Sequence, residues 1–117
     1  MVLTHLEVNV ANPSRPEDAR PVRFVLDSGA VYSVVPRETL EALAIRPYRS
    51  RSFIFGDGSD ITREEGAALF EFRGVRGVSP VLFGKPGDDT VLGRLTLESL
   101  DLFLDPYRRE LLALPTR

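Results

Sequence analysis

The chain has 117 residues, a formal net charge of −2 and no cysteine. This length suits a single domain, 1–117, that can bury a core without covalent cross-links. The lack of cysteine excludes disulfides and thiolate metal sites. The charge offers no basic surface for nucleic acid, and no apolar run approaches the roughly 18 residues that a membrane span needs.

The first third of the chain predicts short strands. Apolar and polar residues alternate over 6–10, which is the signature of a half-buried strand. The polar, proline-containing stretch 11–20 predicts a loop, and 22–26 predicts a second strand that stops at Asp27. A third strand is expected over 31–35.

A short helix is expected after these strands. Proline suits the first turn of a helix, and after Pro36 the residues Leu40, Leu43 and Ala44 recur at helical spacing. We expect this helix to end before Pro47.

The middle of the chain predicts strands joined by glycine-rich turns. Residues 51–55 look extended, 56–59 form a strong turn signal, and 61–72 resume a strand. The glycines within 74–77 would turn the chain back into a strand over 78–83.

The last part of the chain predicts a loop, a helix and a hairpin. After the loop 84–90, the apolar pair of 91–93 is closed by glycine, a short helix follows over 94–100, and 102–104 and 110–114 form a hairpin. Many short strands with one or two short helices indicate an all-β, or mainly β, domain. The apolar residues predicted for its core are Phe24, Leu26, Val34, Leu43, Phe70, Phe72, Leu82, Leu92, Leu95 and Phe103.

The chemistry centres on Asp27-Ser28-Gly29-Ala30, which follows an apolar strand. The strand fixes the backbone, glycine permits a tight turn that exposes the carboxylate, and the serine hydroxyl can hydrogen-bond within the loop. Asp-(Ser/Thr)-Gly alone arises by chance in roughly one chain in twenty of this length, and it is also an ordinary turn. The preceding strand and the downstream motifs favour the functional interpretation.

Taken in this order, the motifs resemble the retropepsin-like (clan AA) aspartic proteases, and in particular their small one-lobed prokaryotic members. The resemblance extends over about 3–114. It implies a closed, β-barrel-like acid protease lobe in which Asp27 is the catalytic residue and Ser28, Gly29 and Ala30 form the catalytic loop.

The resemblance also assigns a supporting loop and a flap. Val91, Leu92, Gly93 and Arg94 would form the loop that packs against the catalytic loop. The hairpin at about 52–63 would cover the substrate, and its substrate-binding residues would be Phe55, Gly56, Asp57 and Gly58.

The chain departs from the family pattern at two places. Many retroviral members carry an acidic residue where this chain has Val31, and that residue pairs with an arginine matching Arg94, so the role of Arg94 stays open. The flap turn contains Asp57 and Asp60 in place of a more apolar, glycine-rich tip. Substrate preference is therefore not transferred.

A single Asp-Ser-Gly motif implies a homodimer. Aspartic proteolysis needs two carboxylates that share one proton, one acting as general base on water and the other hydrogen-bonding the scissile carbonyl. A symmetric dimer supplies the second Asp27. Strands 3–10 and 110–114 could join the two copies in one sheet or close within one chain.

We expect an aspartic-type endopeptidase, a hydrolase that binds a peptide or protein substrate in an extended form. No metal or other cofactor is expected, because His5 is the only histidine and the acidic residues lack EF-hand spacing. There is also no Gly-x-Ser-x-Gly elbow for a serine triad. The N-terminus lacks the pattern of a signal peptide, so we expect a cytoplasmic protein.

Two other functions fit the same sequence. One is a retropepsin-like dimeric peptide-binding or assembly module with weak or no catalysis, since a fold does not fix a function. The intact Asp27-Ser28-Gly29 argues against it, because a pure binding module does not need the carboxylate. The other is an unrelated small β domain in which the motif is a chance turn.

Overall fold

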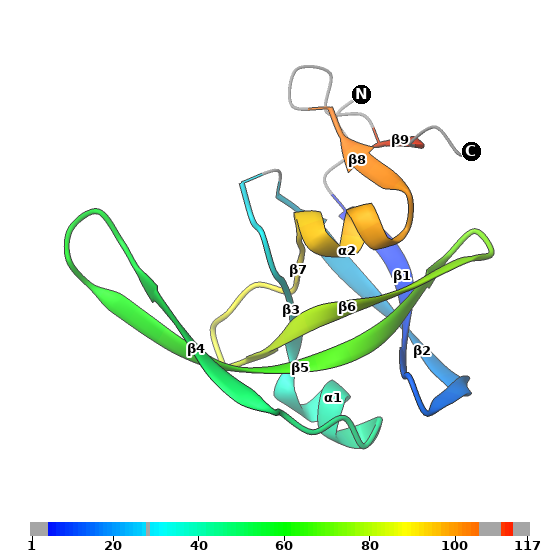
Figure 1. The fold of residues 1–117 in the computed structure, drawn as a ribbon, viewed down its shortest axis with the longest axis horizontal. Coiled ribbons are helices and arrows are strands. Elements are labelled where there is room, and N and C mark those ends of the chain that lie inside the picture. Colours follow the sequence, from blue (N-terminus) through cyan, green and yellow to red (C-terminus); the bar gives the residue numbers. More distant parts are fainter. Residues whose placement is uncertain (1–4, 28, 106–110, 114–117) are drawn as a thin grey trace.

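The computed structural model describes residues 5–27, 29–105 and 111–113, and the fold they form is mainly β, as expected (Figure 1). The elements in chain order are β1 (His5–Asn12), β2 (Arg15–Leu26), β3 (Ser33–Pro36), α1 (Arg37–Ala42), β4 (Arg49–Ile54), β5 (Asp60–Phe72), β6 (Val75–Gly84), β7 (Val91–Leu92), α2 (Arg94–Ser99), β8 (Leu102–Leu104) and β9 (Leu111–Ala113). No helix in this described part is long and apolar enough to cross a membrane.

Seven strands form one sheet in the order β1-β2-β7-β3-β6-β5-β4, and β1 also pairs with β5. The pairs β2–β7 and β3–β6 are parallel, and the other pairs are antiparallel. Within the described residues β4 pairs with β5 alone, so one edge of β4 is left without a strand partner. The β4–β5 hairpin extends away from the body of the molecule (Figure 1).

β8 and β9 form a separate two-stranded sheet, in which Leu102 is opposite Ala113 and Leu104 is opposite Leu111. The C-terminal strand therefore pairs within its own chain over 111–113. The remaining residues of the two terminal strands discussed above, 3–4, 110 and 114, lie outside the described residues.

The loop predicted over 11–20 is wrong, because these residues form a hairpin of β1 and β2. Asn12 is opposite Arg15 across the turn, and the register shifts between Val10 and Asn12. Pro16 lies within that irregularity, where the ladder is interrupted and a missing N–H costs little. The Nδ2 of Asn12 also donates to the carbonyl of Leu43 (3.1 Å), so the hairpin is tied to the end of α1.

The core lies between the sheet and the two helices. Its largest fully buried side chains include Phe24 and Phe70, whose ring centroids are 6.2 Å apart. Of the residues predicted for the core, six are buried (Phe24, Leu26, Leu43, Phe70, Leu82 and Leu92) and three are half-buried (Val34, Phe72 and Leu95).

The prediction for Phe103 is wrong, because its side chain is 39% exposed. Successive side chains of a strand point to opposite faces. Leu102 and Leu104 of β8 pack against the core, and Phe103 between them faces outward.

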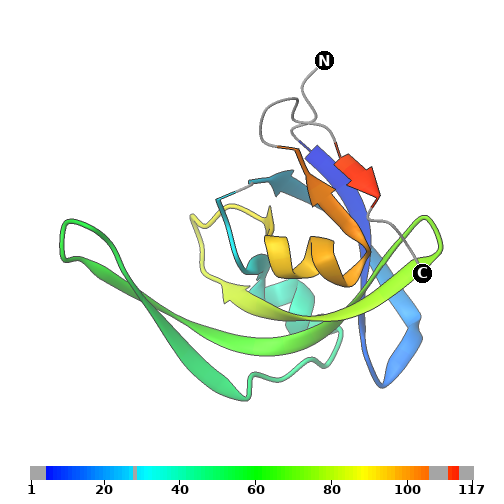
Figure 2. The ribbon, with the colours of Figure 1, turned by 45° about the horizontal axis from the view of Figure 1, so that its top comes forward.

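The helices occupy different sides of the molecule. α2 contacts β6 and buries Thr96 and Leu97, whereas α1 follows Pro36 directly and buries Leu40. Figure 2 shows α2 beside the curved β5–β6 pair. The first turn of α2 lies next to the loop that follows β2, because the N–H of Arg94 donates to the carbonyl of Ala30.

Candidate active site

Asp27 is exposed and follows the buried Leu26 at the end of β2. The backbone N–H of Gly29 donates to Oδ1 of Asp27 (2.9 Å), and the N–H of Ala30 donates to the Asp27 carbonyl (3.1 Å). These two bonds form a tight turn that orients the carboxylate with respect to its own backbone. Ser28, predicted to steady the same loop, lies outside the described residues.

The supporting residues lie beneath this loop. β7 pairs with β2 on one side, where Leu26 is opposite Leu92, and with β3 on the other. The N–H of Arg94 donates to the Ala30 carbonyl (2.9 Å), and that of Leu95 donates to the Val31 carbonyl (3.1 Å). The start of α2 therefore holds the Asp27 loop through its backbone.

Gly93 packs directly against the loop backbone. A Cβ at this position would lie 2.4 Å from the carbonyl carbon of Tyr32 and 2.7 Å from the Val31 oxygen. The N–H of Gly93 donates to Oγ of Ser33 (2.9 Å). No other residue type fits here without displacing the loop.

A buried hydroxyl network continues from this contact. The Ser33 hydroxyl hydrogen-bonds that of Thr96, which also hydrogen-bonds the Ser79 hydroxyl (2.9 Å). All three side chains are buried. The network joins β3, α2 and β6 under the loop and satisfies polar groups that would be costly if left alone.

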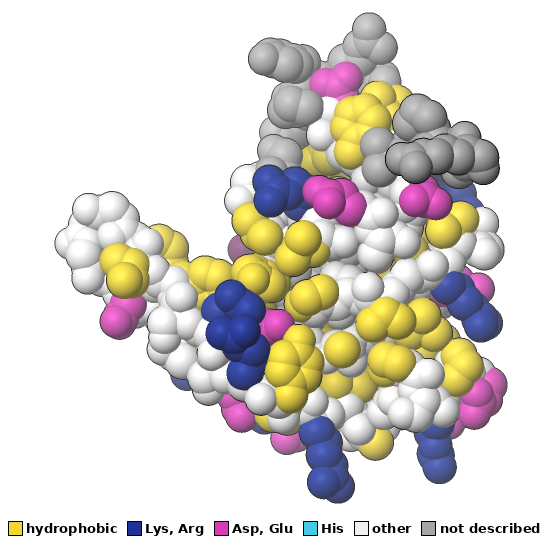
Figure 3. Space-filling model, viewed as in Figure 1, with side chains coloured by type: hydrophobic (Ala, Val, Ile, Leu, Met, Phe, Trp, Pro, Cys, Tyr) yellow, Lys and Arg dark blue, Asp and Glu magenta, His cyan; other side chains and the backbone are white. Residues whose placement is uncertain are grey.

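An apolar groove of about 300 Å³ lies beside the loop. Its lining residues come from the loop, from both strands of the hairpin and from β6: Gly29, Ala30, Val31, Tyr32, Phe53, Phe55, Ile61 and Leu82. Apolar side chains extend along the hairpin to its junction with the body (Figure 3). A larger hollow of about 420 Å³ lies between α1 and residues 84–90, but it includes no residue of the Asp27 loop.

The predicted flap is a hairpin, with Ile54 opposite Asp60 at its end. Its turn is closed by the Phe55 N–H, which donates to the Ser59 carbonyl (2.8 Å), and Gly58 has a φ of 88° that suits glycine. The Ser59 hydroxyl donates to Oδ1 of Asp57 (2.6 Å) and lowers the pKa of that carboxyl.

Only part of the predicted substrate-binding set reaches the groove. Phe55 lines it, whereas Gly56, Asp57 and Gly58 form the exposed turn beyond it. Sequence reasoning missed Phe53, whose position two residues before Phe55 on one strand face was the available signal.

The groove wall is fixed by contacts that the sequence alone did not reveal. The Tyr32 ring contacts Phe53 edge-on at 5.8 Å between centroids, and the Arg51 guanidinium lies over the Tyr32 ring at 4.7 Å. Arg51 Nε donates to Oε1 of Glu65, and the Tyr48 hydroxyl donates to Oε2 (2.7 Å).

Glu65 is 3% exposed and anchors these contacts. Burial alone would raise the pKa of its carboxyl, but the hydrogen bonds from Arg51 and Tyr48, together with the nearby positive charge, lower it overall. The hydrogen bond between Tyr48 and Glu65 also raises the pKa of the Tyr48 hydroxyl. Glu65 is thus held ionised, and it fixes Arg51 against the groove wall.

No model of a known protein family matches the chain, and no curated protein matches it either. The described residues contain no group of three or more acidic or histidine side chains arranged for a metal ion. The residues lining the groove contribute no acidic side chain, and the Asp27 loop enters its lining at Gly29, two residues after Asp27. The exposed Asp27 therefore lies on a tight loop beside an apolar groove, and the exposed Asp57 and Asp60 lie at the hairpin turn on the other side of it.

Proposed function

We propose that this chain is one lobe of a homodimeric aspartic endopeptidase, which hydrolyses peptide bonds with a water activated by two paired Asp27 carboxylates. The observation that carries the proposal is the setting of Asp27. It is an exposed carboxylate on a tight loop, at the end of a buried strand and beside an apolar groove.

The strand pairing supports a retropepsin-like, closed barrel-like lobe. The ladder runs from β1 through β2, β7, β3, β6 and β5, and β5 pairs again with β1. β4 lies outside this ring of pairings and belongs to the projecting hairpin. A ring of paired strands with one projecting hairpin is the arrangement expected of a lobe with a substrate-covering flap.

The chemistry needs two copies of Asp27. When two carboxylates share one proton, the ionised one takes a proton from water, which then attacks the carbonyl carbon of the peptide. The protonated one donates to the carbonyl oxygen, and a proton passes to the leaving nitrogen as the tetrahedral intermediate collapses. The two apparent pKa values belong to the pair and to neither residue alone.

The remaining site residues hold and enclose this pair. The N–H groups of Gly29 and Ala30 fix the orientation of Asp27, and Gly93 and the start of α2 fix the loop from below. The apolar groove would hold a substrate side chain and exclude water from the reacting atoms.

The deciding experiment is cleavage of an unstructured peptide library by the wild type and by Asp27→Asn. Assays should span about pH 3.5 to 7, the range in which one carboxyl of such a pair is protonated. Asp101→Asn is the matched control, because Asp101 is an exposed aspartate at φ 58°, a conformation that asparagine also tolerates. We expect the wild type and Asp101→Asn to cleave and Asp27→Asn to be inactive.

Other results would change the assignment. Equal cleavage by all three proteins would show that Asp27 is not catalytic. Peptide binding by a dimer that cleaves nothing would favour the peptide-binding or assembly module. The absence of both dimer and binding would leave a β domain with a chance turn.

A further inference from the structure

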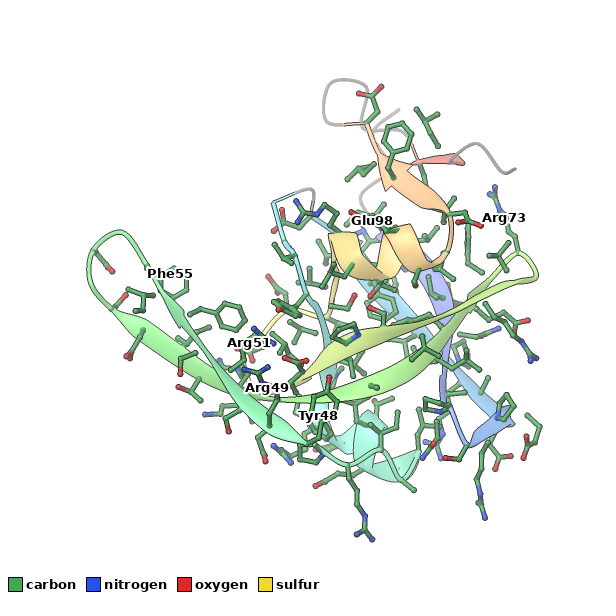
Figure 4. The ribbon with its side chains drawn as sticks, viewed as in Figure 1. Tyr48, Arg49, Arg51, Phe55, Arg73 and Glu98 are labelled. Atoms are coloured by element: carbon green, nitrogen blue, oxygen red, sulfur yellow. The ribbon has the colours of Figure 1, made fainter. Side chains whose placement is uncertain are left out.

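The face of β4 that is turned toward the groove carries two kinds of side chain. Side chains alternate along a strand, so Arg49, Arg51 and Phe53 share one face. Phe53 lines the groove, and Arg51 lies over the Tyr32 ring in its wall. Figure 4 shows Arg49 and Arg51 together at the base of the hairpin, with Phe55 farther toward its tip.

The two arginines differ in whether their charge is neutralised. Arg51 is paired with the buried Glu65. Arg49 is opposite Glu65 in the β4–β5 ladder, but the two oxygens of that carboxylate accept from Arg51 and Tyr48. Arg49 is exposed, and within the described residues no acidic side chain forms an ion pair with it. One positive charge therefore remains at the base of the hairpin.

β4 can also accommodate an extended chain beside it. Its outer edge has no strand partner within the described residues, so its N–H and C=O groups can pair with a peptide. At the rise of a strand, Arg49 and Phe53 are about 13 Å apart along the backbone. A peptide strand alongside has the same rise, so two of its side chains four positions apart face these two residues.

We propose that the site selects extended peptides with an apolar side chain in the groove and an acidic side chain four residues away, bound by Arg49. The inference rests on the proposed function and specifies its substrate class. A carboxylate complements the guanidinium of Arg49 in charge and in hydrogen-bonding geometry. Because Arg49 is exposed, we expect a preference of about two- to fivefold.

The test measures binding apart from cleavage by using the full chain with Asp27→Asn. The probes are fluorescently labelled, unstructured peptides with one phenylalanine and with Glu, Gln or Lys four residues from it, on either side. Affinities are compared at low salt by fluorescence anisotropy, with and without Arg49→Glu. Arg46→Glu is the control, since Arg46 is exposed and lies outside β4.

We expect the Glu peptide to bind about two- to fivefold more tightly than the Lys peptide, with Gln between them. Arg49→Glu should reverse this order, and Arg46→Glu should leave it unchanged. If these affinities are found but the wild type cleaves no peptide in the separate cleavage assay, the proposed protease is overturned and this inference is supported.

Three results would overturn the inference. One is binding that does not depend on the charged residue of the peptide, and another is the absence of binding by every peptide. The third is an Arg49→Glu variant whose oligomeric state, measured by sedimentation, changes while its ranking of the three peptide affinities does not. This face of β4 would then be an interface between copies of the chain.

Discussion

Gly93 shows how one residue determines where the candidate catalytic group lies. It packs against the Tyr32 backbone and directly precedes α2, and α2 donates two backbone hydrogen bonds to the Asp27 loop. The loop position is therefore set by backbone contacts, which tolerate little change in volume.

Gly93→Ala should destabilise the fold and impair the site. The new Cβ would lie 2.4 Å from the Tyr32 carbonyl carbon, so backbone must move, at a cost of about 1–3 kcal/mol in the free energy of unfolding. Urea denaturation measures this cost. Gly56→Ala is the control, because a Cβ there meets nothing within 4 Å and its φ is not positive. Equal stability of the two variants would contradict the tight packing.

A second residue-scale feature is the ion pair of Asp88 with Arg63. Arg63 donates through Nε to Oδ2 (2.7 Å) and through a terminal nitrogen to Oδ1 (2.8 Å), with side chains only 13% and 23% exposed. The Arg63 hydrogen bonds lower the pKa of Asp88. The pair ties β5 to the loop before β7, and its two parallel bonds make it stronger than a single surface contact.

This pair should make stability fall in acid. The pKa of Asp88 is lower in the folded than in the unfolded chain, so its contribution is complete above about pH 4 and is lost as pH falls through the folded value. Asp88→Asn should cost about 1–3 kcal/mol at pH 7 and much less at low pH. Thermal denaturation across this range measures the difference, and a cost that did not change with pH would contradict the prediction.

At the scale of elements, the hydroxyls of Ser33, Thr96 and Ser79 join β3, α2 and β6. Removing the Thr96 hydroxyl takes one partner from each of two buried hydroxyls, although Ser33 still accepts from Gly93 and Ser79 still donates to the Pro80 carbonyl (3.2 Å). α2 then loses its side-chain hydrogen bonds to both strands, whereas β3 and β6 stay joined by their backbone ladder.

Thr96→Val keeps the shape of the side chain but removes both hydrogen bonds. We expect a loss of about 1–3 kcal/mol in the free energy of unfolding. Thr62→Val is the matched control, because Thr62 bonds Ser52 on the exposed hairpin, where a change of only about 0.5 kcal/mol is expected. Chemical denaturation of both variants tests this, and similar losses would show that the buried network adds nothing special.

The elements also show what sequence could and could not predict. The strand before Asp27, the hairpin turn at Gly58 and the helix after Gly93 were predictable, because each signal is local. The β1–β2 hairpin was missed, since Pro16 reads as a loop residue unless the interruption of the ladder is known. Phe103 was misplaced because an apolar triplet does not reveal which face is buried.

The groove could be predicted even less. Tyr32, Phe53, Ile61 and Leu82 come from four separate segments, and only the parallel β3–β6 pairing and the bend of the hairpin bring them together. Glu65 looks like an ordinary surface acid in the sequence. Its charge is satisfied in the interior by two partners outside its own strand, Arg51 on β4 and Tyr48 just before it.

At the scale of the whole molecule, one exposed Asp27 per chain makes the proposed reaction a property of two chains. Each copy would contribute one carboxylate and one groove. Activity should therefore follow the population of dimer and not the total amount of protein.

Mixing the wild type with Asp27→Asn tests this directly. If chains exchange freely, about half of the wild-type chains in an equimolar mixture pair with the variant, so activity per wild-type chain should fall about twofold. Activity per chain should also decrease on dilution, in parallel with the dimer fraction seen by sedimentation. Rates that stay proportional to wild-type concentration, whatever the variant added, would contradict a shared site.

The open edge of β4 has a consequence for the solubility of the protein. A bare strand edge is a template on which identical chains can stack into aggregates. Two β4 strands paired in this way would bring Arg51 and Arg49 of both chains close together, and only Arg51 has a carboxylate to offset its charge. The arginines would thus keep the edge available to an acidic peptide while discouraging self-stacking, and high salt, which screens them, should promote turbidity.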